Sequence, residues 1–211
     1  MDTGVWVISI LSAILLVWYV VAHAWNRRIG VSTSEWLRKG LSAFGSLKEV
    51  RRMGSLASAG QLVVQQAVEP FRSLEVVFLL EPRENLPFWI FTHLDGRRDT
   101  IVVRANMKTA PVQEFEVARS GERGIKKIPA DLQKKPYELI AGPKEFELAR
   151  RGRRDKAAVD RLLAFLDCYR EAIGRISVQS KEPHLTIQAS LPALRKSQPE
   201  DFFEAVRQLA Q

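Results

Sequence analysis

The residues from Val5 to Ala24 form an apolar run that contains no Lys, Arg, Asp or Glu. An α-helix rises about 1.5 Å per residue, so this run is roughly 30 Å long and matches the hydrocarbon core of a bilayer. Trp6 lies near one end of the run, and Trp18, Tyr19 and Trp25 lie near the other. Aromatic rings favour the headgroup layer at both faces of a membrane. The run therefore predicts a single transmembrane helix.

Two other interpretations fit the run less well. Ala22-His23-Ala24 has the small-x-small form of a signal-peptide cleavage site. A signal peptide begins with positive charge and has a shorter apolar region, whereas the only charge before this run is Asp2. A buried core helix of this length rarely lacks a charge altogether. We therefore expect a retained anchor.

The charges around the run predict its orientation. Arg27 and Arg28 directly follow the run, Arg38 and Lys39 come soon after, and no basic residue precedes it. The positive-inside rule places the more basic side in the cytoplasm. We expect a single-pass protein of the cell membrane, with the N-terminus outside and the C-terminal part in the cytoplasm.

Ser9 and Ala13 form a small-xxx-small pair within the run. Such a pair lets a second transmembrane helix approach closely. A Ser in a membrane helix also bonds to its own backbone, which requires no partner. The pair is a candidate contact face for a partner helix.

Composition limits the function classes that the chain can belong to. Roughly 185 residues follow the run, enough for one domain with its own core. Cys168 is the only cysteine, which excludes an internal disulfide, and His23, His93 and His184 show no metal-ligand spacing. The formal net charge is +8, and all Lys and Arg follow the run. This excess favours anionic surfaces, and no cofactor, metal or small-molecule substrate is predicted.

The sequence divides into three segments. Residues 1–28 are the predicted anchor, residues 29–60 a juxtamembrane amphipathic helix with a linker, and residues 61–211 a cytosolic domain. The helix is expected to begin at the capping-box pattern Ser32-x-x-Glu35. The linker is expected where Gly and Ser gather before residue 61.

Alternating apolar residues predict half-buried strands at 74–80, 101–107, 115–117, 176–178 and 185–191. The last two are expected to form a hairpin with one solvated face. Strands that are short and separate from the helices are typical of an α+β domain. The predicted fold class is therefore α+β, with one transmembrane helix followed by antiparallel strands packed with helices.

Two amphipathic helices are predicted in the C-terminal part. One begins after Asp155, carries an apolar stripe as far as Ile173 and ends at Gly174. The other covers residues 197–209.

Residues 86–94 fit two structures. Asp95-Gly96 after them is typical of a hairpin turn, whereas Asn85 before Leu86-Pro87 is typical of a helix N-cap.

No catalytic motif is found in the sequence. It contains no dinucleotide-binding GxGxxG, no phosphate-binding P-loop and no GxSxG nucleophile turn. The prediction is a non-catalytic protein. A Ser–Lys pair that meets only in the fold leaves a membrane-tethered hydrolase as the alternative.

A dense basic cluster precedes the helix that begins after Asp155. Its members are Arg150, Arg151, Arg153, Arg154 and Lys156. Cations at a helix N-terminus oppose the helix dipole, which favours a bound anionic partner, while charge runs are commonly just solvated loops. The candidate partners are anionic lipid headgroups and ribosomal RNA.

Three segments, residues 73–87, 165–180 and 185–192, resemble the calumin family in pattern and order. The family resemblance implies an endoplasmic-reticulum type of intramembrane chaperone, which acts beside the protein-conducting channel with a small multi-spanning partner. This chain lacks the family's acidic segment before the anchor and its coiled coil after the domain, so we expect a compact prokaryotic, archaeal version.

The resemblance implies a non-catalytic accessory factor for membrane-protein insertion and folding. Its expected partners are the protein-conducting channel and a small multi-spanning membrane protein. It also implies a helix at residues 86–93. A basic adaptor at the membrane surface or the ribosome is a further alternative.

Overall fold

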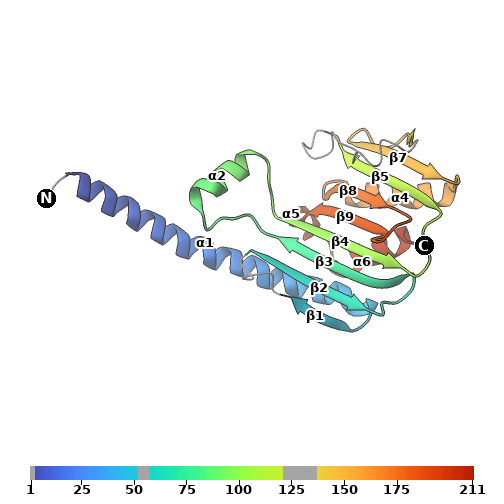
Figure 1. Cartoon of the computed structure of the whole chain (residues 1–211), viewed down its shortest axis with the longest axis horizontal. Coiled ribbons are helices and arrows are strands. Elements are labelled where there is room, and N and C mark those ends of the chain that lie inside the picture. The colour runs from blue at the N-terminus through green and yellow to red at the C-terminus, as the bar shows by residue number, and fades with distance from the viewer. Residues whose placement is uncertain (1–2, 52–57, 121–136) are drawn as a thin grey trace.

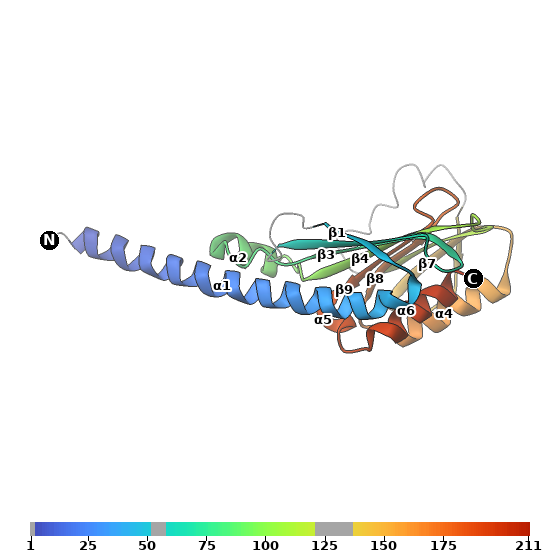
Figure 2. The ribbon, with the colours of Figure 1, turned by 90° about the horizontal axis from the view of Figure 1, so that it is seen from below.

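The computed structural model of the chain describes residues 3–51, 58–120 and 137–211. One long helix, α1 (Thr3–Leu41), extends from a sheet domain, so that the N-terminus lies far from the sheet (Figures 1 and 2). At 1.5 Å per residue its 39 residues measure roughly 58 Å, almost twice the thickness of a bilayer core. The helix therefore has length for both a membrane span and a contact with the domain.

The two parts of α1 have different surroundings. The N-terminal part has a mean hydropathy of 2.5 in its most apolar window and is almost entirely exposed, which is unlike a core helix. From Ala22 onward a stripe of small and apolar residues is buried. It comprises Ala22, Asn26, Gly30, Thr33, Leu37, Gly40 and Leu41. One helix is thus long and apolar enough to span a membrane and also forms part of the domain.

The separate juxtamembrane helix predicted from Ser32 is wrong, because α1 continues through this residue without a break. The Ser32 hydroxyl does not cap a helix but accepts a hydrogen bond from Arg195 Nη2 at 2.6 Å. Gly30, which could have interrupted the helix, is buried against the domain. Tertiary packing overrides the local capping signal here.

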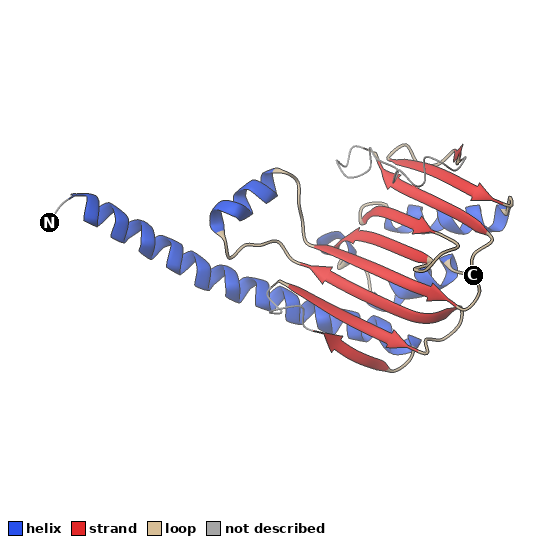
Figure 3. Cartoon of the chain, viewed as in Figure 1, coloured by secondary structure: helices blue, strands red, loops and turns tan. Residues whose placement is uncertain are grey.

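In the described part of the chain, nine strands form one antiparallel sheet in the order β1-β2-β3-β4-β9-β8-β5-β7-β6 (Figure 3). The strands are β1 (Leu47–Arg51), β2 (Ala59–Gln65), β3 (Phe71–Leu79), β4 (Thr100–Met107), β5 (Gln113–Arg119), β6 (Glu138–Ile140), β7 (Phe146–Gly152), β8 (Ile173–Val178) and β9 (Leu185–Ser190). The predicted hairpin β8–β9 forms, but only β9 has an exposed residue on the face expected to be solvated: Gln188 is exposed, whereas Ser177 of β8 is buried.

Strands occupy part of the segment predicted as juxtamembrane helix up to Val50 and as linker from there to Gly60. Residues 47–51 pair with β2, and Ala59 and Gly60 already belong to β2 and pair with β3. The middle of the predicted linker, at Gly54, lies outside the described residues. A boundary at residue 61 would separate β1 and the first residues of β2 from the sheet.

Helices cover one face of the sheet: the second part of α1, α4 (Lys156–Tyr169), α5 (Leu191–Leu194) and α6 (Pro199–Leu209) (Figure 2). Leu37, Leu41 and Phe44 pack into the same core as Phe203. A Cβ on Gly40 would lie 2.5 Å from Phe203 Cδ2, so only glycine permits this close approach of α1 to α6. The C-terminal part of α1 is therefore structural in the domain.

The predicted C-terminal helices exist, with different ends. α4 ends at Tyr169, and Ile173 begins β8 instead of extending the helix. Ile173 is buried in the sheet, which explains why it is apolar. In the sequence its spacing also fits one more turn of the apolar stripe of α4. α6 begins at Pro199, and the Ser197 hydroxyl bonds to the Leu194 carbonyl oxygen instead of capping α6.

Residues 86–94 form a helix, α2 (Leu86–Leu94), which decides between the two predicted structures. Asn85 caps it, because its side-chain oxygen accepts a hydrogen bond from the Phe88 amide at 3.2 Å. Gly96, with φ of 85°, follows its C-terminus. α2 lies beside α1 on the N-terminal side of the sheet (Figures 1 and 2).

Candidate functional site

The candidate site is the junction at which the apolar part of α1 meets α2 and the segment before it. The Trp18 and Trp89 rings lie 5.4 Å apart between centroids, and Trp18 Nε1 donates to the Arg83 carbonyl oxygen at 2.7 Å. His23 Nδ1 lies 2.8 Å from Glu84 Oε1. These contacts join residues far apart in the sequence at the end of the predicted span.

A buried arginine forms the centre of the junction. Arg83 donates two hydrogen bonds to the Asp99 carboxylate, each of 2.9 Å, and a third to Asn26 Oδ1 at 2.8 Å. The guanidinium carbon lies 5.6 Å from the centre of the Trp25 ring. A buried charge is costly unless it is paired and hydrogen-bonded, and this arginine is both.

Glu81 connects the same cluster to α2. Its side chain is 4% exposed, and Oε2 accepts from Trp89 Nε1 at 2.6 Å and lies 3.0 Å from His93 Nδ1. Its backbone carbonyl accepts from Asn26 Nδ2 at 2.9 Å, and its amide donates to Asp99 Oδ1 at 2.8 Å. The cluster of Asn26, Glu81, Arg83 and Asp99, called here the junction network, thus fixes α2 to α1 and to the start of β4.

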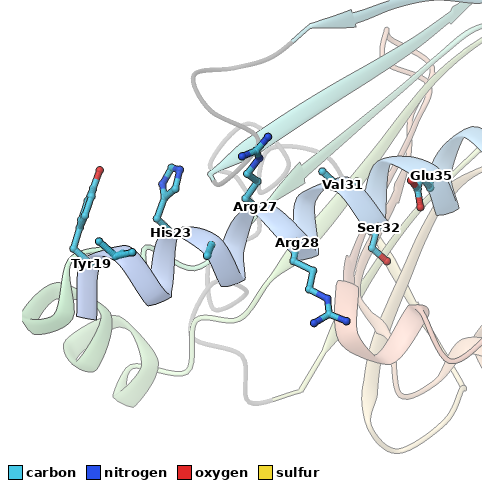
Figure 4. A pocket seen from close by; sticks show the side chains of 9 residues that line it. Tyr19, His23, Arg27, Arg28, Val31, Ser32 and Glu35 are labelled. Carbon is cyan, nitrogen blue, oxygen red and sulfur yellow. The ribbon is translucent and has the colours of Figure 1, made fainter. Parts of the chain in front are cut away.

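A surface depression of about 690 Å³ runs along α1 beside this junction. Figure 4 shows its lining side chains, all of which come from α1, including Tyr19, His23, Arg27 and Glu35. It has no wall from a second element. The depression is therefore a stripe on one helix, which suits contact with another helix better than enclosure of a small molecule.

The two residues predicted as a partner-helix face, Ser9 and Ala13, are exposed on the apolar part of α1. They lie N-terminal of Trp18, where the contacts of the junction begin. The N-terminal part of α1 extends beyond α2 and the sheet (Figure 1). Their surface is consistent with the predicted contact and does not test it.

The predicted basic cluster is divided between two elements at the end of the domain distant from the N-terminus (Figures 1 and 2). Arg150 and Arg151 lie on β7, Arg153 and Arg154 follow it, and Lys156 begins α4. The alternative of a solvated loop therefore does not hold for the first two residues, which belong to a strand. The cluster is also distant from the predicted span (Figures 1 and 2), which does not favour the predicted contact with lipid headgroups.

Carboxylates pair with several of these cations. Arg150 and Arg154 reach Glu138 at 2.9 and 3.0 Å, and Arg151 reaches Glu114 at 3.5 Å. The hydrogen bond from Arg150 and the charge of Arg154 lower the pKa of Glu138 below its usual value.

The Asp155 side chain accepts hydrogen bonds from the first amides of α4, which offsets the unfavourable cations there. Several cations of the basic cluster thus have carboxylate partners within the chain, and the start of α4 is capped by Asp155. Both observations weaken the prediction that the cluster binds an anionic partner. Among residues of the described ranges, no ion pair is formed by Arg153 or Lys156.

The histidines of the described chain have local partners. The Nδ1 atoms of His23 and His93 lie within hydrogen-bonding distance of the Glu84 and Glu81 carboxylates. His184 Nδ1 accepts a hydrogen bond from the Met107 amide at 3.0 Å. Within the described ranges no group of three His, Cys, Asp or Glu side chains suits a metal ion.

Sequence reasoning missed the junction network because its members are distant in the chain. One signal was available: Glu81-Pro82-Arg83-Glu84 places three charges between an apolar strand and an apolar helix. Charged residues in such a setting are often buried as pairs.

Comparisons of the sequence with protein-family models and with curated proteins find no match. The resemblance to the calumin family stays a prediction.

Proposed function

We propose that the chain is a membrane-anchored, non-catalytic accessory factor that acts on membrane proteins during their insertion or folding. In this proposal α1 spans the cell membrane with its N-terminus outside, and the α+β domain lies in the cytoplasm. The single observation that carries the proposal is the continuity of α1 from its exposed apolar part into the buried core of the domain. Such a helix holds the domain at a fixed distance from the membrane.

Contacts at the junction support a span that is retained. Trp18 and His23 lie before the end of the small-x-small site at Ala22-His23-Ala24, and both contact the segment 83–84. Cleavage after Ala24 would remove both contacts and the buried Ala22. A signal peptide is removed without loss to the mature fold, so these contacts favour an anchor.

The cytoplasmic orientation is supported by the charges that follow the apolar part. Arg27 and Arg28 are exposed on α1 directly after it, where they would meet the headgroups of the cytoplasmic leaflet. The more distant Arg38 and Lys39 are exposed as well.

The described contacts also favour binding over catalysis. Each histidine hydrogen bond goes to a carboxylate or a backbone amide. The Lys side chains that make contacts in the described ranges reach carboxylates, and none of them reaches a Ser hydroxyl. The exposed face of α1 at Ser9 and Ala13 and the first part of the stripe, from Tyr19 to Ala24, offer surfaces for membrane helices. With the calumin resemblance, these surfaces favour the protein-conducting channel and a small multi-spanning protein as partners.

A photo-crosslinking amino acid on the apolar part of α1 tests this function. We expect the full-length protein with the probe at Ala13 to cross-link in native membranes to multi-spanning proteins, including channel subunits. Leu11 is the matched control, because it is exposed on the opposite face of the same helix and should give far less of these products.

Equal protein cross-linking from Ala13 and Leu11, or none from either, would contradict the assigned face. Labelling of the purified chain by a serine-directed activity probe would favour the alternative of a membrane-tethered hydrolase.

A further inference from the structure

α2 exposes its apolar side and turns its hydrogen-bonding side inward. Pro87, Ile90, Phe91 and Leu94 recur at helical spacing, and all four are exposed. The exposed fractions of Phe91 and Leu94 are 72% and 79%. A helix on a water-soluble domain has the reverse arrangement, with its apolar stripe against the core.

The inward side of α2 is held by specific bonds. Trp89 and His93 on this side both contact the Glu81 carboxylate, and Thr92 on the same side is buried. The junction network therefore sets which side of α2 faces outward. Rotation of α2 to bury its apolar stripe would break these bonds and leave Glu81 buried without them.

The position of α2 matches the edge of a bilayer. Trp89 packs on Trp18, which lies about 9 Å before Ala24 along the axis of α1. If the apolar part of α1 spans the membrane, α2 lies level with its last turns. This is the depth of 5–10 Å at which interfacial helices bury their apolar side.

A pair of basic residues follows α2, as a pair of basic residues follows the apolar part of α1. Arg97 and Arg98 directly follow α2 and are exposed, as Arg27 and Arg28 are on α1. Arg98 Nη1 donates to the His93 carbonyl oxygen at 2.9 Å, which holds this side chain at the end of the helix. Both pairs of cations would lie at the headgroups of the same leaflet.

We propose that α2 is a second membrane element, an interfacial helix whose exposed apolar side inserts among the lipid acyl chains of the leaflet next to the domain. Lipid is favoured over a protein partner because α2 packs against the apolar part of α1, at Trp18, and so lies beside the predicted span. The inference rests on the span assigned to α1 under the proposed function.

Attachment to the membrane through both α1 and α2 restricts the orientation of the domain more than attachment through α1 alone. A single spanning helix leaves the domain able to rotate about the axis of the span. An inserted α2, fixed to α1 by the junction network, prevents this rotation. The domain then presents one constant side to any partner in the membrane.

The depth of α2 can be measured in full-length protein reconstituted into vesicles of phosphatidylcholine and phosphatidylglycerol. The native Cys168 is replaced by Ser, and single cysteines placed at Leu94, Leu139 and Leu11 carry an environment-sensitive fluorophore. Leu94 and Leu139 are matched, because both are leucines and are 79% and 77% exposed. Leu139 lies on β6, at the sheet edge distant from α1. Leu11 reports on the span itself.

We expect the probe at Leu94 to shift to shorter emission wavelength and to be quenched by lipids that carry a nitroxide near the headgroup. The probe at Leu139 should show neither effect, and the probe at Leu11 should be quenched by nitroxides deeper in the acyl chains. An unquenched Leu94 with a quenched Leu11 would overturn the inference and leave the span intact. An unquenched Leu11 would overturn the span and, with it, the inference.

A protein partner gives a different result. In that case a water-soluble reagent should quench the probe at Leu94 in these vesicles but not in native membranes. This result would assign the apolar side of α2 to a protein partner and overturn the proposal.

Discussion

Replacement of Asp99 by Ala should lower the free energy of unfolding by about 3–5 kcal/mol, the usual cost of removing one partner from a buried ion pair. Arg83 would lose both of its bonds to the carboxylate and the Glu81 amide would lose its acceptor. Neither group is open to water that could replace these bonds, because Glu81 and Arg83 are buried. Urea unfolding of the full-length protein in non-ionic detergent, followed by circular dichroism, measures the change.

Asp167→Ala is the matched control for this experiment. The Asp167 side chain is 63% exposed and pairs with Arg170 at 3.6 Å, so its loss should cost less than about 1 kcal/mol. Similar small losses for the two variants would show that the junction network does not stabilise the fold. The destabilised Asp99→Ala protein should also show faster hydrogen exchange in α2, because Glu81 is then less well fixed.

The second large effect is expected at the contact between α1 and α6. Phe203→Ala should cost about 3–5 kcal/mol, because the side chain is fully buried and its removal leaves a cavity. The centroid of the Phe203 ring lies 6.1 Å from the centroids of both the Trp36 and the Phe44 ring. The ring also fills the space beside Gly40 that a Cβ atom would occupy. The loss therefore falls on the surface that joins the long helix to the domain.

The control is Leu139→Ala, which also truncates a large apolar side chain, but one that is 77% exposed on β6, at the sheet edge distant from α1. In detergent its effect on the free energy of unfolding should stay within about 0.5 kcal/mol. The same urea titration serves both variants. Equal destabilisation by the two substitutions would contradict the burial of Phe203 between α1 and α6.

Local patterns predicted the elements whose signals are contained in a few consecutive residues. The apolar run and the alternation in the hairpin β8–β9 appear in the structure. For residues 86–94 the local pattern fits two structures, and the one with an Asn85 cap is present. The α+β class follows from these and is confirmed. Each depends on contacts within one element or between neighbours in the chain.

The missed features depend on contacts between distant residues. Glycine has a low helix propensity, so Gly40 is unfavourable within a helix. It nevertheless lies within α1, because Phe203 occupies the space that a larger side chain at this position would need. Arg150 belongs to a strand because β7 pairs with β5 and β6 on either side. Neither partner strand is marked in the local sequence around Arg150.

The candidate site was the least predictable part. The junction network joins Asn26 to Arg83 and Arg83 to Asp99, so no short window of sequence contains it. The basic cluster, by contrast, is conspicuous in the sequence and is largely paired in the fold. Local charge density showed where cations gather but gave no information about their partners.

The central claim is that α1 spans the cell membrane and places the domain in the cytoplasm. Cys168, the only cysteine, tests it directly because it is exposed on α4. A membrane-impermeant maleimide added to intact cells should leave Cys168 unlabelled and should label it after lysis, while the protein stays in the membrane during alkaline extraction. A Thr3→Cys, Cys168→Ser variant should be labelled from outside in intact cells. Labelling of Cys168 in intact cells, or release of the protein by alkali, would contradict the claim.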